Sequence, residues 1–93
     1  MQFDKPFEWS LEKNELLKRT RGVCFEDVVQ AIDENDIIAV GPHPNRVQFP
    51  HQQIFVVNIR SYIYKVPFVE DGEKYFLKTI IPDRILRKKY LGD

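Results

Sequence analysis

Residues 54–81, IFVVNIRSYIYKVPFVEDGEKYFLKTII, predict three consecutive antiparallel strands. The runs Ile54 to Ile59 and Tyr62 to Val69 are rich in β-branched and aromatic residues, which favour strands. The dipeptide Asp71-Gly72 is a strong hairpin-turn signal, and the third run, KYFLKTII, follows it. The sequence therefore predicts a β-meander at the centre of the fold.

Strand alternation assigns these residues to two faces. If Asp71-Gly72 is a two-residue turn, Glu70 pairs with Glu73 and Lys65 lies opposite Lys78. A second two-residue turn at Arg60-Ser61 then gives a core face of Phe55, Val57, Ile59, Tyr62, Tyr64, Val66, Phe68, Tyr75, Leu77 and Ile81. The other face, called the open face below, carries Ile54, Val56, Asn58 and the two lysines. Because like charges directly opposite each other are destabilising, such a pair indicates an anion site for phosphate; two lysines extended into water are the alternative.

Helices are expected before this meander. Ser10 is a good N-cap for LEKNELLKRTR, and Gly22 is placed to end that helix. The apolar residues of 25–32 recur at helical spacing, which predicts a second helix. A short strand at Ile37 to Val40 and a proline-rich loop, GPHPNRVQFPHQ, come next. After Pro82, DRILRKKYL is expected to form a short helix or an extended tail.

These elements predict one α+β domain over residues 1–93, with two N-terminal helices packed on a four-stranded, mainly antiparallel sheet. No apolar run approaches the roughly 20 residues of a membrane helix, and the N-terminus lacks a signal-peptide pattern, so we expect a cytoplasmic protein without a membrane partner. One cysteine, Cys24, and two histidines give no zinc spacing, so we expect no metal and no cofactor.

The formal net charge of zero argues against binding of nucleic acid by bulk electrostatics. The C-terminal segment is nevertheless basic. From residue 74 onward it carries Lys74, Lys78, Arg84, Arg87, Lys88 and Lys89 against only Asp83 and Asp93. Acidic residues collect instead in residues 8–36, facing solvent or a basic partner.

An ordered set of motifs along the chain resembles a known family. It consists of FEW at 7–9, Lys13-Asn14, RGVCFEDVV at 21–29, His43-Pro44-Asn45, IFVV at 54–57, VPFVEDGEKYFLKTIIP at 66–82, and Arg84 followed by Lys88, Lys89 and Tyr90. Together these resemble the BrnT toxins of bacterial type II toxin-antitoxin systems, which are related in fold to the RelE and ParE toxins.

The resemblance implies a RelE-like sheet packed on two N-terminal helices, with RNA bound on the open face. It also implies an endoribonuclease that inhibits translation and growth. A cognate DNA-binding antitoxin, of the ribbon-helix-helix or helix-turn-helix type, would neutralise it, and oligomers would form only through that antitoxin.

RNA cleavage without a metal needs a base, cations for the phosphate and an acid for the leaving oxygen. Our candidate catalytic residues are His43 for proton transfer, Lys78 and Arg84 as phosphate ligands, and Tyr90 for stacking or a hydroxyl contact. His51 is the reserve for His43. The candidate RNA-binding residues are Asn45, Arg46, Lys65, Arg87, Lys88 and Lys89.

Each candidate has a structural alternative. His43 between two prolines can shape a turn, and Asn45 can close a turn on its own backbone. Arg84 can form an ion pair with Asp83 or with a carboxylate of the early acidic helices. The function has alternatives too: a non-catalytic toxin that grips a protein target such as DNA gyrase, or a domain that only binds its antitoxin.

Overall fold

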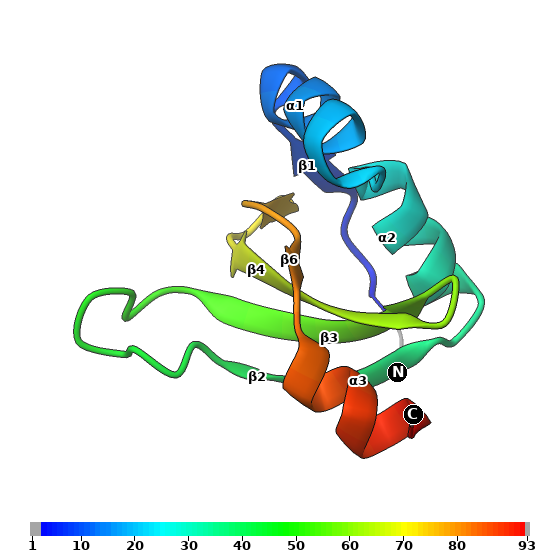
Figure 1. Cartoon of the computed structure of the whole chain (residues 1–93). Helices are drawn as coiled ribbons and strands as arrows, with labels where there is room; N and C mark the ends of the chain where they lie inside the picture. The colour runs from blue at the N-terminus through cyan, green and yellow to red at the C-terminus, as the bar shows by residue number, and fades with distance from the viewer. Residues whose placement is uncertain (1–2, 93) are drawn as a thin grey trace.

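The computed structural model describes residues 3–92, which form three helices and six strands (Figure 1). In chain order the elements are β1 (Phe7–Trp9), α1 (Leu11–Arg21), α2 (Phe25–Asp33), β2 (Ile37–Pro42), β3 (Gln53–Ile59), β4 (Tyr62–Glu70), β5 (Tyr75–Leu77), β6 (Ile81–Pro82) and α3 (Arg84–Leu91). The α+β class and both N-terminal helices are confirmed, and the C-terminal segment is a helix rather than a tail. Within the described residues, no helix is long and apolar enough to cross a membrane.

The sheet is mixed and has the order β1-β5-β4-β3-β2, with β6 paired to β4. Its four expected strands, β2 to β5, are antiparallel neighbours. Two short strands extend it beyond the expected four. β1 pairs in parallel with β5, and β6 pairs with β4 beyond the end of β5. With three and two residues, these strands are too short to produce an alternation pattern.

The two predicted hairpins have different outcomes. The turn at Arg60-Ser61 is confirmed, since Ile59 pairs with Tyr62 and both turn residues have positive φ, 50° and 64°. The two-residue turn at Asp71-Gly72 is wrong: Glu70 pairs with Tyr75, so four residues form the connection. The Asp71 carboxylate explains the longer loop, because it accepts hydrogen bonds from the amides of Glu73 and Lys74 at 2.7 and 2.9 Å.

The longer loop shifts β5 by two residues and removes the predicted pairing of Lys65 with Lys78. Instead the Lys78 amide donates to the Pro67 carbonyl at 2.8 Å, and Lys65 lies opposite Ile81 of β6. A shift of two keeps the side chains of β5 on their predicted faces, so both lysines remain on the open face, displaced diagonally.

The core lies between the sheet and the helices α1 and α2. Seven residues of the predicted core face are buried: Phe55, Val57, Ile59, Val66, Phe68, Tyr75 and Leu77. The helices add Leu17, Phe25 and Val28 to the core. Phe55 and Phe68 stack with ring centroids 3.9 Å apart. Ile81 was predicted in the core and is 37% exposed; Ile80 is buried in its place, because residues 78–80 interrupt the strand and break the alternation.

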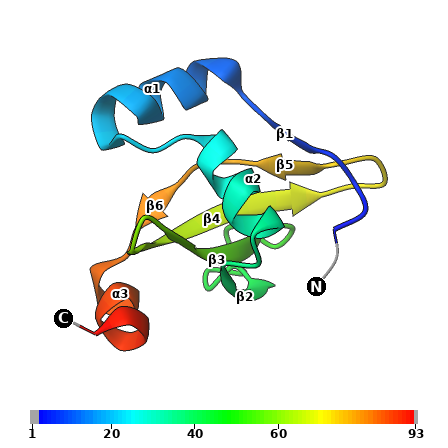
Figure 2. The ribbon, with the colours of Figure 1, turned by 90° about the vertical axis from the view of Figure 1, so that its right-hand side faces the viewer.

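α3 lies on the other side of the sheet from α1 and α2 (Figures 1 and 2). It contacts β4 and buries none of its own residues. Asp83 caps it, accepting from the Leu86 amide at 2.8 Å, and the Asp83 amide donates to the Ile63 carbonyl of β4. The basic C-terminal helix is thereby fixed beside the open face.

Candidate functional site

Lys65, on β4, is half-buried on the open face and forms an ion pair with Asp83. The Asp83 Oδ2 lies 3.2 Å from the Lys65 Nζ, and 33% of the lysine side chain and 17% of the aspartate side chain are exposed. The pKa of Asp83 is lowered, first by the hydrogen bond from the Leu86 amide and then by Lys65. The carboxylate is therefore charged at neutral pH and occupies the position in which a phosphate oxygen would meet Lys65.

Lys78 and Arg84 have no carboxylate partner within residues 3–92. Both side chains are exposed. The Lys78 Nζ lies 5.4 Å from the centre of the Phe76 ring, a cation–π contact that leaves its hydrogen-bond donors available. Arg84 is the first residue of α3, and the aspartate that precedes it pairs with Lys65 instead. The expected alternative for Arg84, an ion pair with Asp83, is absent from the described residues.

The remaining cations of α3 lie around the β3–β4 turn. Arg87 donates from Nε to the Ser61 carbonyl at 3.3 Å and packs over the Tyr62 ring. Lys88 and Lys89 are exposed, and the Lys89 Nζ lies 5.3 Å from the ring centre of Tyr90, which is itself 45% exposed. This end of α3 presents positive charge and one aromatic ring to solvent.

His43 begins the connection between β2 and β3. Its Nδ1 accepts a hydrogen bond from the Asn45 amide at 3.0 Å, and its ring packs against Phe49 with centroids 4.6 Å apart. Because Nδ1 acts as the acceptor, the neutral ring carries its proton on Nε2. His43 thus shapes the loop, which is the structural alternative given for it above, and its Nε2 is also a hydrogen-bond donor.

Asn45 closes the same loop through its side chain. Its Oδ1 accepts from the Gln48 amide and its Nδ2 donates to the Gln48 side chain, both at 3.1 Å. These contacts correspond to the turn-closing alternative. Arg46 is exposed, and no hydrogen bond or ion pair of its side chain occurs within the described residues.

The structure does not gather all ten candidates around one phosphate. The His43 amide bonds to Gln52 at one end of β3, whereas Arg87 bonds to Ser61 just past the other end. At about 3.3 Å per residue, Gln52 and Ile59 are roughly 23 Å apart. Figure 1 shows the same separation: the β2–β3 loop projects away from α3. Lys65, Lys78 and Arg84 lie between these ends.

An apolar groove on the open face extends from the β2–β3 loop to Lys65. Its volume is about 230 Å³. The groove is lined by Ala39, Val40, Gly41, Pro42, Pro44, Ile54, Val56 and Lys65. Pro44, next to His43, closes one end, and Lys65 supplies the sole charged group in the lining. The small residues Ala39 and Gly41 lie opposite Val56 and Ile54, which leaves a hollow over β2 beside those larger side chains.

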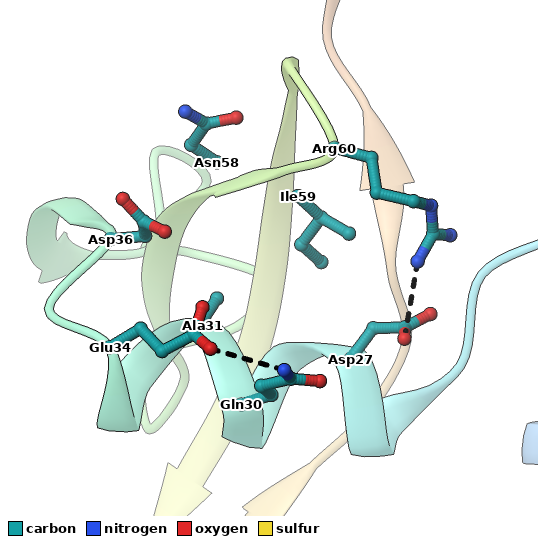
Figure 3. Close-up of a pocket in the computed structure, with 8 residues that line it drawn as sticks. All are labelled: Asp27, Gln30, Ala31, Glu34, Asp36, Asn58, Ile59 and Arg60. Atoms are coloured by element: carbon teal, nitrogen blue, oxygen red, sulfur yellow. Dashed lines mark hydrogen bonds and ion pairs between the residues drawn. The ribbon is translucent and has the colours of Figure 1, made fainter.

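A second pocket, on the helix side, is shown in Figure 3 and has the opposite charge. It is lined by Asp27, Gln30, Ala31, Glu34, Asp36, Asn58, Ile59 and Arg60, and its volume is about 130 Å³. Its arginine is already paired with Asp27 at 3.2 Å. Since three carboxylates surround it, this pocket disfavours a phosphate. Among the described residues, no three His, Cys, Asp or Glu side chains are grouped to hold a metal ion.

Two features of the site were missed by the sequence reasoning. Asp83 precedes an eight-residue helix, a position typical of an N-cap, but its second contact to Lys65 depends on β6 pairing with β4. The groove depends on which residues of β2 and β3 are opposite each other, and the sequence carries no signal for that register.

Comparisons of the chain with protein-family models, with curated proteins and with solved structures gave no match.

Proposed function

We propose that this protein is a metal-independent endoribonuclease of the BrnT type, with a RelE-like fold, that acts as the toxin of a bacterial type II toxin-antitoxin system. RNA would lie along the open face, from the His43 loop past Lys65 to α3. Cleavage of RNA would inhibit translation and growth.

One observation carries the proposal: the cations beside the open face are available for phosphates. Lys78, Arg84, Lys88 and Lys89 form no ion pair within residues 3–92. Elsewhere Lys5, Lys18, Arg60 and Lys74 are each paired with a carboxylate, whereas Lys13, Arg19 and Arg21 of α1 are not. Unpaired lysine and arginine side chains on one surface are the electrostatic feature that phosphate binding requires. A local group of unpaired cations can bind RNA phosphates even though the net charge of the chain is zero.

The residues divide the proposed chemistry between them. Arg84 offers a bidentate fork and Lys78 a point charge to the phosphate. To protonate the departing 5′-oxygen, His43 would act from Nε2 as the imidazolium, and its Nδ1 would then give up the hydrogen bond from the Asn45 amide. The later residues of α3 would bind nucleotides farther along the RNA, because Arg87 bonds to Ser61 beyond the end of β3 that is far from His43. These residues are Arg87, Lys88, Lys89 and Tyr90.

The partner in this proposal is a cognate DNA-binding antitoxin of the ribbon-helix-helix or helix-turn-helix type. The support for it is the resemblance to BrnT toxins along residues 7–90. Antitoxin binding over α3 or the open face would exclude RNA from the same cations.

The test is controlled expression of wild type, Arg84→Ala and Arg19→Ala in bacteria, with growth and RNA integrity followed at matched protein levels. We expect wild type and Arg19→Ala to arrest growth and cleave RNA, and Arg84→Ala to lose both effects. Arg19 is a suitable control because it is an exposed cation on α1, on the other side of the sheet. Growth arrest with intact RNA contradicts the proposal.

A second candidate function, binding of a protein target such as DNA gyrase, is favoured by the apolar surface of α3. Ile85 is 80% exposed and Leu91 is 40% exposed. Aliphatic side chains in water contribute little to RNA binding and are typical of protein contacts. Growth arrest with DNA damage and intact RNA would select this function.

A further inference from the structure

The groove on the open face has the properties of a subsite for one planar ring. Its volume of about 230 Å³ is below the usual range for drug-sized ligands, roughly 300–1,000 Å³. Ala39 and Gly41 form a low floor, and the larger apolar side chains of Ile54 and Val56 stand beside it. The faces of an unsaturated ring fit such a floor because they need no hydrogen-bond partners.

The charge around the groove favours a ring that carries a phosphate. Among residues 3–92, Lys65 is the single charged residue of the lining, and the carboxylate beside it is that of Asp83, its ion-pair partner. The Lys65 ammonium is held by one carboxylate oxygen at 3.2 Å and remains partly exposed, so a phosphate can replace Asp83 without movement of the backbone. Lys78, on the same face, is available for a neighbouring phosphate.

We infer that this groove binds a nucleobase of the RNA, with the attached phosphate on Lys65. The inference rests on the proposed function and names the part of the substrate that the open face recognises. Pro44 places the other end of the groove beside the His43 loop. A base seated here therefore positions the adjoining phosphodiester between Lys65 and His43. The base subsite would thus fix the position of the RNA on the sheet independently of the cations of α3.

Gly41 provides a variant that fills the groove without strain. A Cβ added there meets no atom within 4 Å, and its φ lies outside the left-handed region. Gly41 lies opposite Ile54, so its side chain would point into the groove. Because isoleucine is favoured in strands, Gly41→Ile should fold at least as stably as wild type. Gly72→Ile is the matched control, because a Cβ at Gly72 also meets nothing within 4 Å and the residue lies in the β4–β5 connection.

The experiment is an NMR titration of the ¹⁵N-labelled chain with adenosine monophosphate, and in parallel with ribose 5-phosphate. We expect the adenosine compound to shift the amides of Gly41, Val56 and Lys65 in wild type and Gly72→Ile, and to bind about tenfold more weakly to Gly41→Ile. Ribose 5-phosphate should bind about tenfold more weakly than the adenosine compound to wild type. Equal shifts from the two compounds would overturn the inference, since they would show a phosphate contact without a base subsite.

Two further outcomes would also overturn it: no shift at the groove with either compound, and undiminished adenosine monophosphate binding by Gly41→Ile. A third outcome that would overturn it is a Gly41→Ile protein that cleaves RNA normally but no longer binds its antitoxin, because a protein side chain would then occupy the groove. The titration requires no RNA cleavage, so failure of the base subsite is distinguished from failure of the nuclease proposal, in which the wild-type chain leaves RNA intact.

Discussion

Asp83 joins the C-terminal helix to the open face by its contact with Lys65. One carboxylate oxygen caps α3 through the Leu86 amide, and the other lies 3.2 Å from the Lys65 ammonium. The same aspartate thus positions the basic helix and neutralises the central lysine of the proposed RNA surface. An RNA phosphate that binds Lys65 must compete with Asp83.

The variant Asp83→Asn separates these two roles. Asparagine is as good an N-cap as aspartate, so α3 should remain in place, while the loss of the negative charge makes Lys65 available. If this partly exposed ion pair contributes about 0.2–1 kcal/mol, as surface pairs do, RNA should bind roughly 1.4- to 5-fold more tightly at low salt. Fluorescence anisotropy with a labelled oligonucleotide measures the change. Asp71→Asn, in the distant β4–β5 turn, is the control, and an affinity for Asp83→Asn no tighter than that of the control would refute the competition.

Asp83 also predicts a pH dependence of stability. Its pKa is lowered in the folded chain, first by the Leu86 amide, so its contribution is complete above the unfolded aspartate value of about 3.9. The contribution is lost as the pH falls through the lower, folded-state pKa. We expect the melting temperature of wild type to fall more steeply than that of Asp83→Asn between about pH 5 and pH 2.5. The pKa values of Glu26, Asp27 and Asp71 are lowered in both proteins, so the difference between the curves reports Asp83. Parallel melting curves would be inconsistent with a lowered Asp83 pKa.

Asn14 is expected to be essential for the junction of α1 and α2. Its side chain is 3% exposed, accepts from the Phe25 amide at 2.7 Å and donates to the Glu26 carboxylate at 2.7 Å. Asn14→Ala leaves the buried amide of Phe25 without a partner, which should lower the free energy of unfolding by about 1–3 kcal/mol. Urea denaturation measures this, and Glu15→Ala, exposed on the same helix, should change stability by less than about 0.5 kcal/mol. A loss at Asn14 no larger than at Glu15 would show that the junction does not depend on this side chain.

The exposed cations of α3 predict a salt dependence of RNA binding. Replacing Lys88 or Lys89 with alanine should reduce the slope of log affinity against log salt by about 0.7–0.9, the value for one phosphate contact. The effect should be similar for different RNA sequences, since phosphate contacts carry no sequence information. Arg19→Ala on α1 should leave the slope unchanged. Equal slopes for all four proteins would place the RNA elsewhere.

His43 is predicted to act in the chemical step rather than in binding. His43→Ala should lower the cleavage rate by about 10²-fold or more, because a positioned proton donor contributes roughly 10²- to 10⁴-fold, while RNA affinity changes little. His51→Ala is the matched control, since His51 is the chain's other histidine and is exposed in the same loop. Single-turnover cleavage of a labelled RNA measures both. If His51→Ala loses activity and His43→Ala retains it, the two histidines exchange roles in the mechanism.

Much of the fold could be predicted because its signals are local. Ser10 and Gly22 cap the two ends of α1 and so mark where the helix begins and ends. Alternation along β3 and β4 assigns Phe55, Val66 and Phe68 to the core. The parallel pairing of β1 with β5 could not be predicted, since it joins segments more than 60 residues apart with only three residues in each strand. The β4–β5 register was missed because the Asp71 side chain stabilises a longer turn than the Asp-Gly dipeptide suggests.

The candidate site was predictable by residue type but not by arrangement. Strand alternation assigned Lys65 and Lys78 to one face, whereas Arg84 was named as a phosphate ligand without a place in the fold. Sequence reasoning placed Asp83 beside Arg84, whereas the pairing of β6 with β4 brings Asp83 to Lys65. The separation of His43 from Arg87 by the length of β3, about 20 Å, follows only once the pairing of β3 with its neighbours and the position of α3 are known.

The central claim is that this chain cleaves RNA without a metal. The most direct test is incubation of the purified protein, in the presence of EDTA, with end-labelled RNA both free and in polysomes, followed by analysis of the fragment ends. The account predicts cleavage to fragments with 2′,3′-cyclic phosphate and 5′-hydroxyl ends, and no cleavage where the attacking 2′-hydroxyl is replaced by hydrogen. RNA that stays intact in both forms, or that is cleaved only when a divalent metal is restored, would contradict it.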